Sequence, residues 1–169
     1  MKYLITAAAG AMLLAAPAMA QQGATGQGNF IGADGEQIGT ATLTGTPTGV
    51  LIEISLEALP PDSWVAFHVH ETGSCDPETD HESAGAHFNP TDVEHGYLTE
   101  TGPHAGDMPN QFVNADGVLE AQVFNGAVTL DEGDAGIMGR ALMIHAGPDD
   151  YTSQPSGDAG DRLACAVIE

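Results

Sequence analysis

Residues 67–107 read FHVHETGSCDPETDHESAGAHFNPTDVEHGYLTETGPHAGD, and this stretch contains six of the seven histidines of the chain. The six are His68, His70, His81, His87, His95 and His104. Neutral imidazole is the commonest metal ligand in proteins, and a protein domain has little structural reason to gather so many imidazoles in one segment. The stretch therefore predicts a metal-binding segment.

The stretch begins inside a predicted strand, residues 63–70 (SWVAFHVH). Successive side chains of a strand point to opposite faces, so Val65 and Phe67 are expected to face the core. His68 and His70 then lie side by side on the outer face, where both imidazoles can reach one ion.

Two sets of donors can be assembled from the histidines. The first has three imidazoles and one carboxylate at intervals of eight, nine and three residues: His87, His95, His104 and Asp107. Such a set suits tetrahedral zinc. The second has four imidazoles, which suits copper: His68, His70, His145 and a shared His87. His87 is the natural shared ligand because each of its two ring nitrogens can hold one metal ion.

His81 is interpreted as a bystander, because it lies in a polar run between acidic residues. The pair His81-Glu82 is not followed by a second histidine at the spacing of the zinc-protease helix motif. That class of metal site is therefore excluded.

The remainder of the chain alternates short apolar runs with turn residues, and no helical period is present. Strands are expected at 37–43, 50–56, 63–70, 111–113, 118–124, 127–130, 137–145 and 163–168. Residues 114–117 (NADG) predict a hairpin between the fourth and fifth of these strands. Residues 71–109 and 146–161 are expected to be irregular, the first of them ordered by its metal ions. This pattern is typical of an all-β sandwich or barrel.

The N-terminus has the features of a secretory signal. Met1-Lys2 is a positive start, an apolar run follows, and Ala18-Met19-Ala20 matches a cleavage site. We expect residues 1–20 to be removed on export, to the periplasm or beyond the cell. Residues 21–29 are polar and rich in glycine, which predicts a flexible tail. Residues 30–169 remain as one domain.

The mature chain is strongly acidic, with Arg140 and Arg162 as its only Lys or Arg residues against 24 acidic residues. Nucleic acids and anionic membranes need basic surfaces, so neither is expected as a partner. The acidity has two open explanations, which are solubility through self-repulsion and a hydrated surface suited to a salty habitat.

Cys75 and Cys165 are the two cysteines. An oxidising compartment favours a disulfide between them, closing a loop of about ninety residues that is worth roughly 4–5 kcal/mol in chain-entropy terms. The alternatives are two free thiols, or Cys75 as a metal ligand.

Six longer motifs together resemble the copper/zinc superoxide dismutase family, over a range from about Gly32 to the C-terminus. The motifs are FHVH (67–70), SAGAHFNP (83–90), HG (95–96), HAGD (104–107), GRALMIH (139–145) and GDRLAC (160–165). Cys75 lies five residues after His70 and a signal sequence precedes the domain, as in the bacterial exported branch.

The resemblance implies a Greek-key β-sandwich, or flattened barrel, with long metal-binding loops. It implies dismutation of superoxide to oxygen and hydrogen peroxide in antioxidant defence, by alternate reduction and oxidation of copper, with zinc as structural and pKa-setting partner. The implied copper ligands are His68, His70, His87 and His145. The implied zinc ligands are His87, as bridging imidazolate, with His95, His104 and Asp107.

Further roles follow from the same resemblance. Arg162 would hold the substrate anion, and His87 would take up and return a proton. Asp149 would link a copper-ligand histidine to a zinc-ligand histidine, and Cys75 and Cys165 would form the family disulfide. A monomer and a homodimer are both compatible with it.

The chain departs from the family in one respect that affects substrate encounter. Residues 146–161 carry four aspartates and no lysine, whereas family members commonly guide superoxide with cations around the channel. Ala66 also replaces a glycine common in the family, a change expected to be harmless. Two other classes of function would use the same fold, namely a copper/zinc carrier without turnover and an adhesive or structural sandwich. The complete ligand set and Arg162 speak against both.

Overall fold

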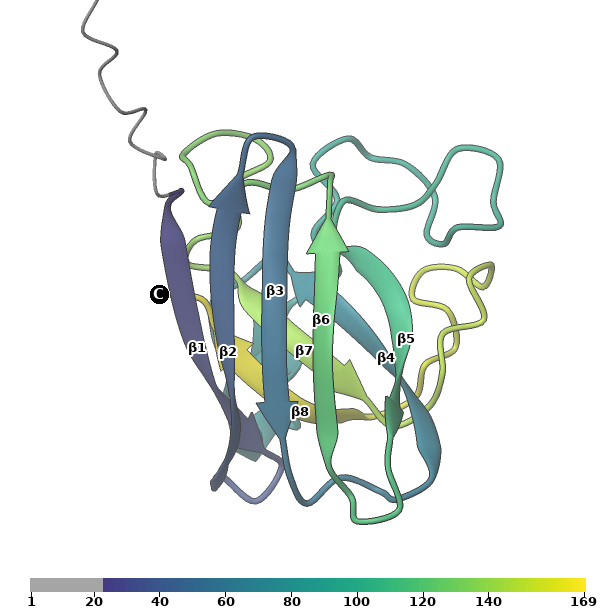
Figure 1. Ribbon diagram of the computed structural model, residues 1–169. Coiled ribbons are helices and arrows are strands. Elements are labelled where there is room, and N and C mark those ends of the chain that lie inside the picture. Colours follow the sequence, from purple (N-terminus) through teal and green to yellow (C-terminus); the bar gives the residue numbers. More distant parts are fainter. Residues whose placement is uncertain (1–22) are drawn as a thin grey trace, which may run out of the picture.

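The computed structural model describes residues 23–169 as an all-β fold (Figure 1). Its strands are β1 (Thr25–Gly32), β2 (Gln37–Thr46), β3 (Gly49–Leu56), β4 (Ser63–His70), β5 (Asp107–Val113), β6 (Leu119–Asn125), β7 (Ala141–His145) and β8 (Arg162–Val167). Two short 3-10 helices, η1 (Pro77–Thr79) and η2 (Glu82–Ala84), follow β4. The expected signal sequence lies outside the described residues.

The eight strands form one sheet in the order β5-β4-β7-β8-β1-β2-β3-β6. All pairings between these strands are antiparallel. β4–β7, β8–β1 and β3–β6 are neighbours that are far apart in sequence, so the chain crosses between layers as in a Greek key. In Figure 1, β1, β2, β3 and β6 form one layer in front of β4, β7 and β8. The predicted all-β sandwich, or flattened barrel, is confirmed.

The core lies between the layers and follows the period of two. In β3, Val50, Ile52 and Ile54 are buried, whereas Ser55 is exposed and Leu51 and Glu53 are only partly covered. The largest fully buried side chains come from both layers: Phe30, Leu43, Ile52, Leu56, Phe67, Leu119, Leu142 and Ile144. At about 25 cal/mol per Å² of apolar area, this burial is the main stabilising term of the fold.

From Val65 to His70, both faces of β4 are buried, although only one faces the core. Val65 and Phe67 point inward, as predicted, and His68 and His70 on the other face are 0% and 1% exposed. The long segments 71–106 and 146–161 cover this outer face. Protein contacts hold the first of them, because Phe88 is buried in the core and the Asn89 side chain hydrogen-bonds both backbone groups of Val93.

Four predicted elements differ from the structure. Residues 127–130 form no strand, and only Thr129 makes an isolated bridge, to Gly136. Residues 25–29 belong to β1 and not to a flexible tail. The inward-facing residues there are Gly26 and Gly28, so this part of the strand lacks the apolar alternation that predicts a strand from sequence. A Cβ on Gly28 would lie 2.8 Å from the carbonyl oxygen of Val167, so glycine permits the close approach of β1 to β8. The seventh strand begins at Ala141 and not at 137. The NADG turn is present, but β5 pairs with β4 and β6 with β3, without a described ladder between β5 and β6.

Within residues 23–169, no helix is both long and apolar enough to span a membrane.

Candidate metal centre

Four histidines meet beneath two long loops, the first at residues 71–106 and the second at residues 146–161. His68 and His70 come from β4, His87 from the first loop, and His145 from the end of β7. One ring nitrogen of each lies within 4.8 Å of those of the other three, and all four residues are buried. The Nε2 atoms of His70 and His145 are 3.4 Å apart. His68 Nδ1 and His87 Nε2 are buried without a hydrogen-bond partner.

His68 and His70 each use one ring nitrogen to hydrogen-bond a group outside the four-histidine cluster. The other ring nitrogen of each then presents a lone pair toward the centre of the cluster. His70 Nδ1 is 2.9 Å from the Gly85 carbonyl, and His68 Nε2 is 2.9 Å from Asp149 Oδ2. A carbonyl or carboxylate can only accept, so these nitrogens donate and the opposite nitrogen of each ring is unprotonated. Such lone pairs, converging without a proton between them, fit a metal cation.

A second group surrounds Asp107 at the start of β5. Its Oδ1 lies 3.0 Å from His87 Nδ1 and 3.4 Å from His104 Nδ1, and its Oδ2 lies 3.1 Å from His95 Nδ1. Ligands about 2.0 Å from a tetrahedral zinc ion are about 3.3 Å from one another. The donor type and spacing therefore fit zinc, and the four residues are all buried.

His87 belongs to both groups through different ring atoms. Its Nδ1 faces Asp107, whereas its Nε2 is the buried atom without a partner described above. The rings of His87 and His68 are 4.0 Å apart between centroids. The structure thus brings together every histidine that the sequence placed in the two donor sets, in the two predicted groupings.

Burial keeps three histidines of the first group neutral. Burial lowers the pKa of His70 to about 2, of His145 to about 3 and of His87 to about 4. His95 behaves differently: burial alone would lower its pKa, but hydrogen bonds to Asp107 and Asp149 outweigh burial and raise it to about 9. A metal ion at His95 Nδ1 would take the place of that proton, because ligands bind metal in the deprotonated form.

Asp149 connects the two groups from behind. Its Oδ2 accepts from His68 Nε2 at 2.9 Å and its Oδ1 from His95 Nε2 at 3.0 Å. Asn110 holds Asp149 in turn, since its side chain accepts from the Asp149 amide and donates to the Asp149 carbonyl, both at 2.8 Å. No motif or spacing pointed to Asn110, because its role depends on β5 passing beside the second loop.

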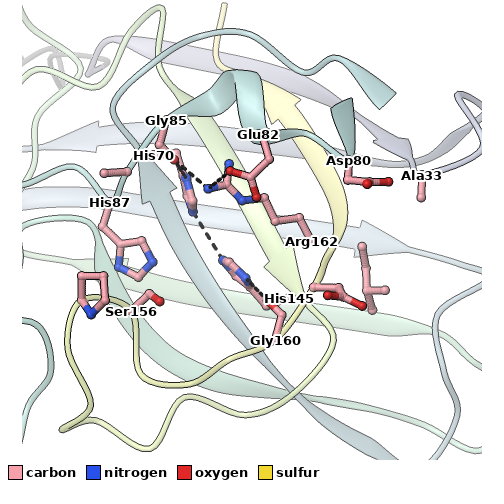
Figure 2. A pocket seen from close by; sticks show the side chains of 14 residues that line it. Ala33, His70, Asp80, Glu82, Gly85, His87, His145, Ser156, Gly160 and Arg162 are labelled. Carbon is pink, nitrogen blue, oxygen red and sulfur yellow. Dashed lines mark hydrogen bonds and ion pairs between the residues drawn. The ribbon is translucent and has the colours of Figure 1, made fainter. Parts of the chain in front are cut away.

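Arg162 begins β8 and lies opposite His145 in the strand register. Its Nη1 donates to the His81 carbonyl at 2.8 Å and its Nη2 to the Gly85 carbonyl at 2.9 Å. Figure 2 shows the guanidinium beside His70 and His145 in one pocket, of about 760 Å³, whose rim also includes Asp80, Glu82 and Asp161. A cation with its orientation fixed therefore lines the entrance to the four-histidine group.

His81 belongs to neither donor group, as the sequence predicted, but it is not an ordinary residue of a polar run. Its side chain is fully buried, and neither ring nitrogen has a hydrogen-bond partner among the described residues. Burial lowers its pKa. It belongs to neither donor group, and it contributes the carbonyl that orients Arg162.

The predicted disulfide is confirmed: Cys75 and Cys165 are joined, with an S–S length of 2.02 Å. It ties the first loop to β8, three residues from Arg162.

Comparison with known proteins agrees with this geometry. A sequence model described as copper/zinc superoxide dismutase matches residues 37–168. The chain belongs to the copper/zinc superoxide dismutase family. The curated relative "Superoxide dismutase [Cu-Zn] 2" of Aquifex aeolicus is 45% identical, and the match covers 99% of each chain. The protein of that family from Escherichia coli is 38% identical over 80% of each chain.

Solved structures of the superoxide dismutase family have the same fold. A superoxide dismutase-like protein from Bacillus subtilis matches with a TM-score of 0.79 and 35% identity, covering 83% of this chain and 95% of that one. The copper/zinc superoxide dismutase of Brucella abortus matches with a TM-score of 0.71 and 28% identity, covering 86% and 100%. The two histidine groups of this chain fit the copper and zinc sites of the family.

Proposed function

We propose that this protein is an exported superoxide dismutase that converts superoxide to oxygen and hydrogen peroxide. One observation carries the proposal: a four-histidine group and a three-histidine, one-carboxylate group share His87, and Arg162 lies at the entrance of the first. A carrier needs ligands, but it does not need an oriented cation at a pocket open to small anions.

In this proposal, copper is held by His68, His70, His87 and His145, and zinc by His87, His95, His104 and Asp107. Copper would supply a one-electron redox couple that accepts an electron from one superoxide and returns it to the next, and zinc would supply a fixed charge without redox chemistry. The buried atoms without partners, His68 Nδ1 and His87 Nε2, support this assignment.

Arg162 would bind and orient the substrate. Its Nη1 and Nη2 each donate to a backbone carbonyl, which fixes the plane of the guanidinium. A guanidinium offers five N–H donors in a rigid fork, so donors remain for a small anion. Superoxide held there would lie next to His145, the register partner of Arg162.

His87 would manage a proton at its Nε2, the ring atom that faces the four-histidine group. This nitrogen is buried and has no hydrogen-bond partner among the described residues, so a proton accepted there would be free to pass to an anion held in the pocket. Asp107 holds Nδ1 on the opposite side, which keeps the ring in place.

Asp149 would fix the tautomers of His68 and His95. Because its two oxygens accept from one nitrogen of each ring, both Nδ1 atoms are held as lone pairs toward the two metal groups. One carboxylate thereby couples the positions of a copper ligand and a zinc ligand.

Export is the remaining part of the proposal. The signal features of residues 1–20 motivate it, and the disulfide between Cys75 and Cys165 is typical of an oxidising compartment. Detection of a mature N-terminus at Gln21 in exported protein would support it, whereas an intact Met1 in the cytoplasm would contradict it.

The test is dismutase activity and metal content of the protein loaded with copper and zinc, beside two variants. Arg162→Ala should keep both metals and lower kcat/KM by about ten- to a hundredfold, the range for losing a charged hydrogen bond to substrate. His145→Ala should lose copper and activity while retaining zinc. A wild-type protein that binds both metals without dismutase activity would establish a carrier instead.

A further inference from the structure

Arg162 already has an anion beside it. Glu82 Oε2 lies 3.4 Å from Arg162 Nη2, and Glu82 is the only carboxylate within salt-bridge distance of this guanidinium among residues 23–169. The side chain of Glu82 is 71% exposed, whereas that of Arg162 is 14% exposed. Figure 2 shows the two side chains meeting at the pocket, on the side of His70 and Gly85.

We propose that Glu82 is an internal competitor for the substrate-binding edge of Arg162, and that it sets how strongly the site takes up small anions. The inference rests on the function proposed above. A substrate anion must replace the Glu82 carboxylate at Nη2 before it gains the full strength of the guanidinium. Glu82 thus limits the affinity of the site for small anions.

The backbone places Glu82 there. Glu82 begins η2, between His81 and Gly85, whose carbonyls accept from Nη1 and Nη2 of Arg162. The turn that orients the guanidinium therefore also brings a carboxylate to its edge. The position is local and does not depend on the overall acidity of the chain.

The exposure of Glu82 makes the competition modest and reversible. An exposed ion pair is weak and is screened by salt, so an anion can displace the carboxylate without a change in fold. The expected effect of removing it is about a two- to fivefold gain in anion affinity, which is the range for such pairs.

The other acidic residues of the pocket affect a bound anion only through their electrostatic repulsion, without a contact to Arg162. Asp80 and Asp161 line the same pocket, but neither is paired with Arg162 in the described structure. Substituting one of them therefore distinguishes the effect of the Glu82–Arg162 contact from the effect of negative charge around the pocket.

The experiment uses azide as a small anion, titrated by visible absorption into the copper- and zinc-loaded protein at low ionic strength. Glu82→Gln should lower the azide Kd by about two- to fivefold, and the gain should shrink in about 0.5 M salt. Asp80→Asn changes the same pocket without the contact. Glu120→Gln makes the same charge change on exposed β6, which no described ladder joins to β8. Both controls should change the Kd less than Glu82→Gln does.

An equal gain in either control, or no gain in Glu82→Gln, would overturn the proposal. A measurement on the metal-free protein tests the Glu82–Arg162 pairing independently of the proposed dismutase function. Phenylglyoxal should modify Arg162 about two- to fivefold faster in metal-free Glu82→Gln than in wild type. Arg140, which donates to two backbone carbonyls and stacks on Phe88, is the internal reference. An unchanged Arg162 rate, measured by peptide mass spectrometry, would contradict the pairing even if copper never binds.

Discussion

Asp149 shows how much one residue can determine at this centre. It accepts from one histidine of each metal group. In Asp149→Asn one of the two imidazole N–H groups would face an amide N–H₂, because an amide has a single acceptor oxygen. We expect metal affinity to fall about 10- to 100-fold, measured by competition with a chelator. Asp158→Asn, an exposed change in the same loop, is the matched control and should bind metal as wild type does. Equal affinities in all three proteins would contradict the role of Asp149.

The buried histidines predict acid sensitivity of the metal-free protein. Burial holds the pKa of His70, His145 and His87 at about 2, 3 and 4, against about 6.5 in an unfolded chain. Their contribution is complete above pH 6.5 and is lost as pH falls below it, because only the unfolded chain then takes up these protons. The pKa of His95 is raised to about 9. Its protonation stabilises the folded state, and this stabilisation is complete below pH 6.5, so His95 adds no further pH dependence there.

The free energy of unfolding should therefore fall by at most about 4 kcal/mol per pH unit below pH 6.5. Urea unfolding of the metal-free protein at pH 7.5, 6.5 and 5.5 measures it. His70→Gln should reduce the slope by about 1.4 kcal/mol per pH unit. Stability that stays constant or rises toward pH 5.5 would be inconsistent with neutral buried imidazoles.

At the residue scale, the sequence was informative where chemistry restricts the residue type. Ligand histidines and Asp107 could be found because their types and spacing fit two metals. His81 was correctly left out of both donor sets, but its burial was not predicted, because it depends on how the loop folds over the ring. Glu82 and Asn110 had no signal, since their contacts depend on how loops and strands pack.

At the scale of elements, alternation predicted the strands with apolar inward residues and missed the one without them. β4 could be read because Val65 and Phe67 alternate with other residues, and it correctly placed His68 and His70 together on the outer face. β1 was missed because glycines occupy its inward positions. The order of strands and the register could not be predicted, since pairs such as β3–β6 join distant parts of the chain.

The disulfide is the element-scale feature with the clearest test. Cys75 and Cys165 are 90 residues apart, and closing such a loop is worth roughly 4–5 kcal/mol in chain-entropy terms. The paired substitution Cys75→Ser with Cys165→Ala should lower the free energy of unfolding by about that amount in denaturant titration. It should also weaken anion binding, because the first loop supplies the two carbonyls that orient Arg162. A loss below about 1 kcal/mol would show that other contacts hold the loop.

At the scale of the whole molecule, charge opposes the approach of substrate. Residues 21–169 have two arginines and no lysine against 24 acidic residues, and superoxide is an anion. Attraction comes from Arg162 and the bound metals at short range, and repulsion from the rest of the surface. Salt screens the long-range repulsion more strongly, since the Debye length is about 10 Å at 0.1 M. We expect kcat/KM to rise or stay level between about 10 and 200 mM salt. A steep fall would mean that attraction dominates despite the acidity.

The most direct measurement of the central claim is the decay of superoxide in the presence of the mature protein loaded with one copper and one zinc per chain. Pulse radiolysis gives the rate constant without a coupled assay. We predict decay that is first order in protein and much faster than the spontaneous dismutation of superoxide. Decay at the spontaneous rate, with both metals bound, would contradict it.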